Sequence, residues 1–142
     1  MPAAFEESAP ALSPDGHWLA YQSDQTGQTE VYVQSYPAPG ARVPVSLEGG
    51  SEPAWAHSGR ELFYRVGDSL MAASVTMAPA FAVTGRRRLF AGPFLNGGTF
   101  REYDVAPDDQ HFVMISGGTA QSILLGAQNV FQRLVYERQQ QR

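Results

Sequence analysis

Three similar segments follow one another along the chain, and this internal repeat constrains the fold more than any other feature. The segments run over residues 9–21, 52–64 and 102–114, and each has an apolar stretch, a polar turn and a second, strand-forming stretch. The repeat recurs about every 43 to 50 residues, which is the length of a four-stranded β-propeller blade. We therefore predict an all-β chain of about three four-stranded antiparallel blades, the last of them incomplete.

The polar turns contain residues that favour a tight reversal of the chain. In Ser13-Pro14-Asp15-Gly16 the proline presets φ, the aspartate side chain can bond to its own backbone, and the glycine tolerates positive φ. Residues 58–59 and 107–109 take the same place in the second and third repeats. His57 and Ser58 stand where the first repeat has Pro14 and Asp15, and we expect this departure to loosen the second hairpin.

The turn-rich segments divide a single domain, residues 1–142, into blades. We place blade 1 at about 5–49, blade 2 at about 50–94 and blade 3 at about 95–128. Third strands are expected at residues 30–36, 69–75 and 122–126, and fourth strands at 43–47 and 88–90.

A different pattern occupies the place of a fourth strand in the third repeat. The apolar residues of the segment 130–135 fall on one face of a helix, and Asn129 is suited to cap its N-terminus. We therefore predict a short C-terminal helix at about 129–138, followed by a frayed polar tail.

Composition excludes several classes of function. The net charge is −4 and the one basic cluster is Arg86-Arg87-Arg88, so a nucleic-acid-binding face is not expected. The absence of cysteine excludes disulfides, thiolate metal sites and cysteine nucleophiles. No apolar stretch is long enough to span a bilayer, and the N-terminus has no signal-peptide pattern. We expect no membrane insertion, and either a cytoplasmic protein or a piece of a larger one, with the compartment otherwise left open.

The side chains that commonly carry out catalysis do not form a recognised pattern in this chain. His17, His57 and His111 lie in or beside the polar turns, they do not occupy equivalent repeat positions, and no serine lies in a nucleophile-elbow motif. No histidine pair has metal-binding spacing, and the paired glycines lie between predicted strands instead of opening a helix. We predict a protein without catalytic residues, bound metal or cofactor.

Three carboxylates give the one candidate ligand-binding site. Glu52 and Glu102 occupy equivalent positions, each at the start of the innermost strand of a predicted blade. Asp104 is expected on the same side as Glu102 because side chains alternate along a strand. This position faces the mouth of the central channel in a propeller. We predict that the three carboxylates, doubled in a twofold ring, form a negative funnel that attracts a cation or a basic peptide.

These motifs resemble the TolB-type, WD-like β-propeller repeat. The likeness rests on Leu12-Ser13-Pro14-Asp15-Gly16-His17-Trp18-Leu19-Ala20-Tyr21, on Glu52-Pro53-Ala54-Trp55 and on Tyr103-Asp104-Val105-Ala106-Pro107-Asp108. The chain from about Phe5 to about Leu134 is similar to the C-terminal blades of propellers in large bacterial proteins, including propellers attached to serine/threonine kinase domains. The resemblance implies a propeller fold, although family propellers usually have about six to eight blades.

An open arc of about three blades has an uncovered apolar face at each end. Such patches are rarely left exposed on a soluble monomer, and two copies would complete a six-bladed ring through head-to-tail contacts at both joints. We therefore predict a homodimer. The alternative is a truncated fragment of a family propeller.

The leading functional hypothesis is a non-enzymatic interaction or scaffold module, because propellers present loops on rigid blades and the fold itself carries no chemistry. Its partners would be a second copy of the chain and a protein or peptide ligand. The alternative implied by the resemblance is an accessory or sensor domain of a larger bacterial enzyme linked to a kinase or peptidase. A third hypothesis is a hydrolase, whose catalytic domain this chain does not contain.

Overall fold

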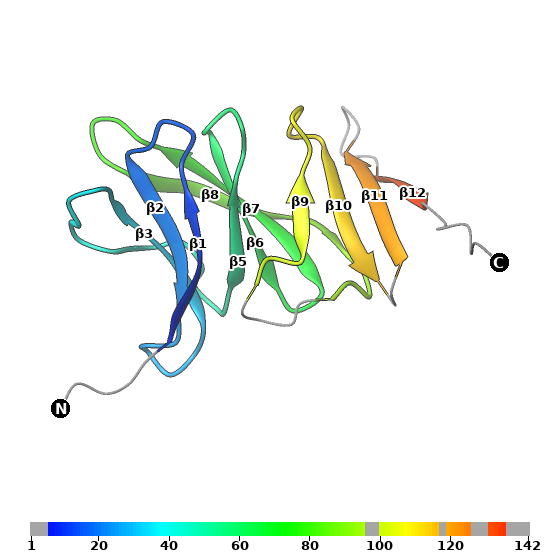
Figure 1. The fold of residues 1–142 in the computed structure, drawn as a ribbon, viewed down its shortest axis with the longest axis horizontal. Helices are drawn as coiled ribbons and strands as arrows, with labels where there is room; N and C mark the ends of the chain where they lie inside the picture. The colour runs from blue at the N-terminus through cyan, green and yellow to red at the C-terminus, as the bar shows by residue number, and fades with distance from the viewer. Residues whose placement is uncertain (1–5, 96–99, 117–118, 126–130, 136–142) are drawn as a thin grey trace.

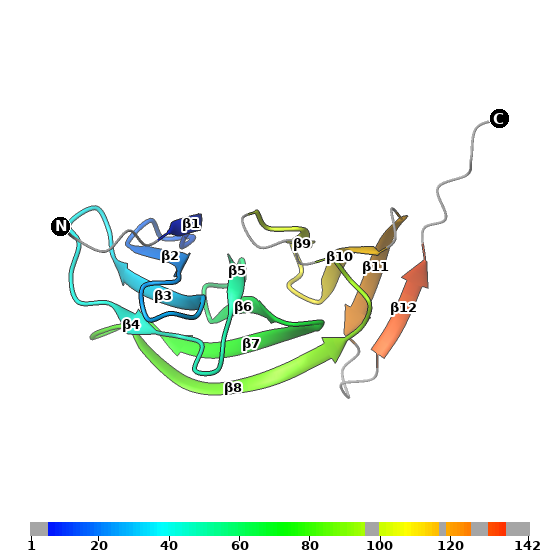
Figure 2. The same cartoon turned by 90° about the horizontal axis from the view of Figure 1, so that it is seen from below.

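The computed structural model describes residues 6–95, 100–116, 119–125 and 131–135. In this part of the chain the only regular secondary structure is β-strand. The strands form three four-stranded antiparallel sheets, each built from strands that are consecutive in the sequence. The sheets stand side by side in a curved row, with the first strand of each on the concave side (Figures 1 and 2). The all-β fold of four-stranded antiparallel sheets predicted from the repeat is confirmed.

We call each sheet a blade. Blade 1 consists of β1 (Glu7–Leu12), β2 (Trp18–Ser23), β3 (Glu30–Ser35) and β4 (Val43–Pro44). Blade 2 consists of β5 (Ser51–Trp55), β6 (Glu61–Val66), β7 (Ser69–Thr76) and β8 (Ala82–Ala91). Blade 3 consists of β9 (Tyr103–Val105), β10 (His111–Ser116), β11 (Thr119–Leu125) and β12 (Phe131–Val135).

The polar turns of the repeat connect the first and second strands of each blade. Gly16 and Gly59 occupy equivalent turn positions and have φ values of 77° and 74°. Asp109 takes this position in blade 3 with φ of 58°, a conformation that most non-glycine residues avoid. The turn chemistry read from the sequence therefore lies where it was expected, with one aspartate in a place that favours glycine.

The predicted C-terminal helix is wrong for residues 131–135. These residues form β12, which pairs antiparallel with β11 from Leu125↔Phe131 to Gln121↔Val135 and completes the third blade. Residues 129–130 and 136–138 of the predicted helix lie outside the described residues. The helical reading failed because a short apolar run fits either period, whereas β11 offers an unpaired edge that a fourth strand satisfies.

The other two fourth strands differ from each other in length. β8 spans Ala82–Ala91 and pairs along the whole of β7, so it is much longer than the expected 88–90. β4 is limited to Val43–Pro44 because Pro44 has no N–H to donate, which confines it to a sheet edge. After it, the Val45 N–H still donates to the Val31 carbonyl at 2.8 Å, so the chain stays against blade 1.

Two apolar clusters join the three blades, and β6 contributes to both. Leu62 and Tyr64 belong to the cluster shared with blade 1, whereas Phe63 between them belongs to the cluster shared with blade 3. The Phe63 and Phe112 rings meet edge to face across the second joint, with centroids 4.9 Å apart. A strand that is buried on both faces needs apolar residues at consecutive positions, which explains the run Leu62-Phe63-Tyr64.

The innermost strands of blades 1 and 2 share an irregularity at the same point of the repeat. The pairing register of β1 breaks between Ser8 and Ala11, and that of β5 breaks between Ser51 and Ala54. Within these breaks Ala9 and Glu52 have positive φ values of 51° and 54°. Such bulges redirect a side chain out of the regular alternation of the strand.

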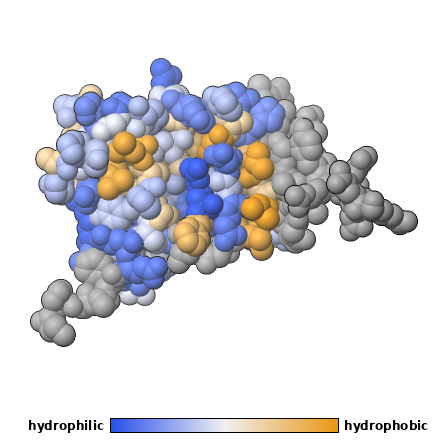
Figure 3. All heavy atoms as spheres, viewed as in Figure 1, coloured by the Kyte–Doolittle hydropathy of each residue, from blue (hydrophilic) through white to orange (hydrophobic). Residues whose placement is uncertain are grey.

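Several large apolar side chains remain exposed among the described residues. Figure 3 shows apolar surface interspersed with polar surface on the face seen in Figure 1, including apolar patches over blade 3. The exposed side chains are Leu12, Tyr36, Leu47, Leu95, Phe100, Val113 and Ile115. Within the described ranges no helix is present that is long and apolar enough to cross a membrane.

Candidate functional site

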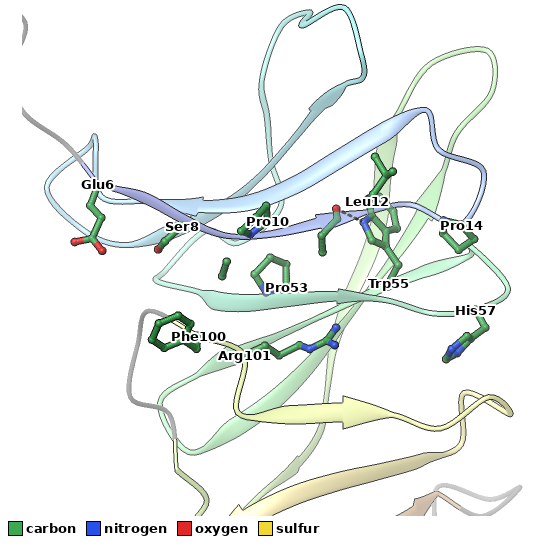
Figure 4. Close-up of a pocket in the computed structure, with 12 residues that line it drawn as sticks. Glu6, Ser8, Pro10, Leu12, Pro14, Pro53, Trp55, His57, Phe100 and Arg101 are labelled. Atoms are coloured by element: carbon green, nitrogen blue, oxygen red, sulfur yellow. Dashed lines mark hydrogen bonds between the residues drawn. The ribbon is translucent and has the colours of Figure 1, made fainter.

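An open groove of about 1050 Å³ runs along the innermost strands on the concave side of the blades. β1 and β5 form one side of it, and the segment leading into β9 forms the other, with Phe100 and Arg101 (Figure 4). We call it the axial groove. It is lined by Glu6, Ser8, Ala9, Pro10, Ala11, Leu12, Pro14, Pro53, Trp55, His57, Phe100 and Arg101.

The walls of the axial groove are mainly apolar and partly rigid. Pro10 and Pro53 lie within the two bulges and have restricted backbones. The Trp55 indole is buried, and its Nε1–H donates to the Ala11 carbonyl at 2.9 Å, so the ring is held across the joint between blades 1 and 2. Phe100 on the opposite side is 77% exposed. The groove therefore offers a fixed aromatic floor and a solvent-exposed aromatic ring.

Charged groups lie at separate points of the axial groove. Arg101 pairs with Asp104 at 3.5 Å in an exposed position, where an ion pair contributes little stability and is easily exchanged for a ligand. Glu6 lines the end of the groove opposite His57 (Figure 4). The groove thus presents both an anionic and a cationic group beside its apolar walls.

His57 is tied to the neighbouring blade. The Asp109 carboxylate accepts hydrogen bonds from the backbone N–H groups of His57 and Ser58 at 2.7 and 3.0 Å, and its Oδ1 lies 2.9 Å from His57 Nδ1. Burial of Asp109 acts to raise its pKa, but these bonds outweigh burial and hold the pKa below its usual range. Residues 57 and 58, which replace the Pro-Asp of the first repeat, thus bond through their backbone N–H groups to Asp109 of blade 3.

Glu52 lies inside the molecule and does not line the axial groove. Its N–H donates to Gln22 Oε1 at 2.9 Å, its Oε1 accepts the Glu102 N–H at 2.5 Å, and its carbonyl accepts the Tyr103 hydroxyl at 2.6 Å. Oε2 is buried without a hydrogen-bond partner in the part of the chain that the structure describes. Burial raises the pKa of this carboxyl, opposed by the Glu102 N–H and by the charge of Arg65. Glu52 therefore connects all three blades.

The Glu102 backbone N–H contacts the Glu52 carboxylate, but Glu102 and Asp104 line a hollow on blade 3 that does not include Glu52. This shallow hollow of about 330 Å³ is also lined by Arg101, Tyr103, Val113 and Ile115. Asp104 is exposed, and its Oδ1 also accepts the Val105 N–H at 2.9 Å. The structure brings Glu102 and Asp104 together but turns Glu52 into the joint, so a ligand site shared by all three carboxylates stays a prediction.

The remaining candidates from the sequence have local partners. His111 Nδ1 lies 2.6 Å from Asp108 Oδ2 in its own turn, and the His17 N–H donates to Asp15 Oδ1 at 3.0 Å. In the basic run, Arg86 Nε donates to the Val45 carbonyl at 2.6 Å. Among the described residues, no group of three or more histidine and acidic side chains is placed to hold a metal ion.

Two features of the site were not found by sequence reasoning. Arg101 and Phe100 carried no motif, and only their position before an innermost strand could have indicated them. Arg65 was also missed, although an arginine inside the apolar run of β6 was a visible signal. It is fully buried, and its guanidinium donates to backbone carbonyls that include Leu95 O at 2.9 Å, which ties blade 2 to the segment that leads to blade 3.

The chain is similar in three dimensions to several solved propeller structures. The TolB structure from Acinetobacter baumannii matches with a TM-score of 0.62 and 18% identity, over 93% of this chain and 33% of that chain. A structure of the nidogen/laminin complex matches with a TM-score of 0.64 and 14% identity, over 94% of this chain and 49% of that chain. The fold is that of β-propeller blades.

A third similar structure is named as an enzyme. It is a putative 6-phosphogluconolactonase from Bacteroides uniformis, with a TM-score of 0.58 and 14% identity over 92% of this chain and 41% of that chain. This chain therefore spans less than half the length of each of these three structures. No family model and no curated protein matches the chain. At these identities the likeness establishes the fold alone.

Proposed function

We propose that this chain is a non-enzymatic interaction module that binds an extended protein segment in the axial groove. The observation that carries the proposal is the groove of about 1050 Å³ with prolines and aromatic rings along its walls. Binding sites with largely apolar walls and a few polar groups are typical of ligand recognition, and this one is larger and more open than a small ligand requires.

The strands at the groove favour recognition through side chains over the addition of a strand. Pro10 and Pro53 lie on β1 and β5, the innermost edge strands of their sheets, and neither has an N–H to offer to an incoming strand. The exposed Phe100 ring instead offers a flat apolar surface on which proline or aromatic side chains of a peptide can pack, and the largely buried Trp55 ring lines the groove as well. Arg101 would fix the orientation of the peptide through an acidic group.

We further propose that a second copy completes the ring. Three blades in a curved row leave one face of blade 1 and one face of blade 3 without a neighbouring blade among the described residues. A homodimer with head-to-tail joints would cover both faces and give six blades.

The second candidate function is that of an accessory or sensor domain of a larger bacterial enzyme. The observation that favours it is the coverage of only 33–49% of the three similar structures. In that arrangement further blades of a longer chain would cover the open faces, and the axial groove would still be the binding site.

Peptide selection on the 142-residue protein tests the leading proposal. A phage-displayed library of unstructured peptides would be panned against it, and the enriched peptide would be synthesised and titrated by calorimetry. We expect Phe100→Ala and Arg101→Ala to weaken binding about tenfold or more, because both side chains face the groove. Leu47→Ala is the matched control, since Leu47 is exposed and lies outside the groove.

Two results would contradict the proposal. The first is a selected peptide whose affinity is unchanged in both groove variants. The second is hydrolysis of 6-phosphogluconolactone by the wild-type protein above the spontaneous rate, which would make the chain an enzyme like the one for which its structural neighbour is named.

A further inference from the structure

The same repeat positions meet at both internal joints between blades, and the open faces of blades 1 and 3 carry these positions as well. Two neighbouring positions on the second strand of each blade are involved. The first is occupied by Leu19, Leu62 and Phe112 in blades 1, 2 and 3, and the second by Ala20, Phe63 and Val113. In the joint between blades 2 and 3, Phe63 of the earlier blade packs on Phe112 of the later blade. In the joint between blades 1 and 2, Ala20 and Leu62 share one cluster in the same way.

The same positions on the open faces have no neighbouring blade among the described residues. On blade 3, Val113 is 41% exposed and Ile115 is 37% exposed, and Asp104 opposite Val113 is exposed as well. On blade 1, Leu19 lies opposite Leu12, which is exposed, so both are on the face away from blade 2. Val113 thus stands where Phe63 stands in the internal joint, and Leu19 stands where Phe112 stands.

A backbone contact repeats at both internal joints near the axis. The Glu102 N–H donates to the Glu52 carboxylate of the blade before it, and the Glu52 N–H donates to the Gln22 side chain of the blade before it. Ala9 is the equivalent residue of blade 1, and it shares the bulge and the positive φ of Glu52. β9 has no such bulge and Glu102 has no positive φ, so this contact does not define an acceptor for a following blade.

We propose that the open face of blade 3 binds the open face of blade 1 of a second copy, with Val113 against the partner's Leu19. This joint deepens the proposed self-association, on which it rests. It is head to tail, so two such joints close a ring of two chains. The occupant is a second copy because its blade 1 supplies, at equivalent positions, the residues that blades 2 and 3 use in the internal joints.

Charge exchange across the joint tests the pairing. The mass of the protein would be measured by size-exclusion chromatography with light scattering at micromolar concentration, where we expect the wild type at twice the 15.5 kDa chain mass. Val113→Glu and Leu19→Arg each place an unpaired charge in the joint, so we expect each single variant at the mass of one chain. The double variant places opposite charges together at both joints, and we expect it to recover the dimer at low salt.

Two further variants make the test independent of misfolding. Leu47→Arg adds the same charge in the exposed loop between β4 and β5, and this control is expected to remain dimeric. Val113→Ala removes apolar contact without adding a charge, and we expect it to raise the dimer dissociation constant about tenfold. Circular dichroism of each variant verifies that the blades are folded.

The outcomes separate the joint from the self-association on which it rests. A wild-type protein at the mass of one chain overturns both. A wild-type dimer that neither Val113→Glu nor Leu19→Arg dissociates overturns this joint alone and leaves self-association standing through another surface. Recovery of the dimer by the double variant supports the pairing of Val113 with Leu19, and absence of recovery overturns that pairing.

Discussion

Replacement of Glu52 by alanine and by glutamine separates its hydrogen bond from its charge. In Glu52→Ala the partly buried Glu102 N–H loses its acceptor, which costs about 1–3 kcal/mol. The cavity left by the shorter side chain adds about 1 kcal/mol, so we expect unfolding to become easier by about 2–4 kcal/mol. The alanine leaves the backbone strain at the positive φ of residue 52 unchanged, because glutamate and alanine both carry a Cβ.

Glu52→Gln keeps the size of the side chain and its acceptor oxygen but removes the titratable group. Burial raises the pKa of Glu52 in the folded protein, so its contribution to stability is full below the unfolded-state pKa and is lost as pH rises through the folded-state pKa. We therefore expect the glutamine variant to gain stability relative to wild type between pH 5 and pH 8.

Urea unfolding at pH 5 and pH 8, followed by tryptophan fluorescence, measures both effects. A glutamine variant that loses as much stability as the alanine variant at pH 8 would refute this reasoning. It would mean that an ionised Glu52 is held favourably by the charge of Arg65, and that burial is not the dominant influence on its pKa.

Two other substitutions test the joint between blades 2 and 3. Asp109→Gly removes three contacts to His57 and Ser58 but relieves the positive φ, and we expect a net loss of about 1 kcal/mol in thermal unfolding. Because the pKa of Asp109 is lowered, this loss should shrink as pH falls through the folded-state pKa, and a loss that is constant down to pH 2 would contradict the carboxylate's role. Phe63→Ala should cost about 3–5 kcal/mol, measured by urea unfolding, because the ring is buried against Phe112, and a cost below about 1 kcal/mol would contradict that packing.

The fold could be predicted from the sequence because its signals are local and repeated. The turn at Ser13-Pro14-Asp15-Gly16 and the apolar stretches on either side of it specify a hairpin without knowledge of the rest of the chain. The C-terminal segment lacked such a turn signal, and residues 131–135 became a strand because β11 provides an edge, which no local pattern records. The sequence therefore predicted the blades well but missed the fourth strand of the last one.

The candidate site was harder to predict, since it depends on where a bulge turns a side chain. Strict alternation along a strand places Glu52 at the channel, as it was expected to lie. The break in register between Ser51 and Ala54 instead directs the carboxylate into the joint between blades, where it is fully buried. Residues without any motif, Phe100 and Arg101, line the groove because they precede β9 on the concave side.

Two departures from the repeat, at His57 and Asp109, contact each other, and this indicates that they adapt blade 2 and blade 3 to one another. A proline at position 57, as at Pro14, would have no N–H to donate to Asp109. A glycine at position 109, as at Gly16, would have no carboxylate to accept that bond. His57 supplies the N–H donor and Asp109 the carboxylate acceptor of one hydrogen bond between blade 2 and blade 3, so each residue explains the other. The regular repeat residues specify the hairpin of each blade, and this one pair of exceptions adds a contact specific to the joint between blades 2 and 3.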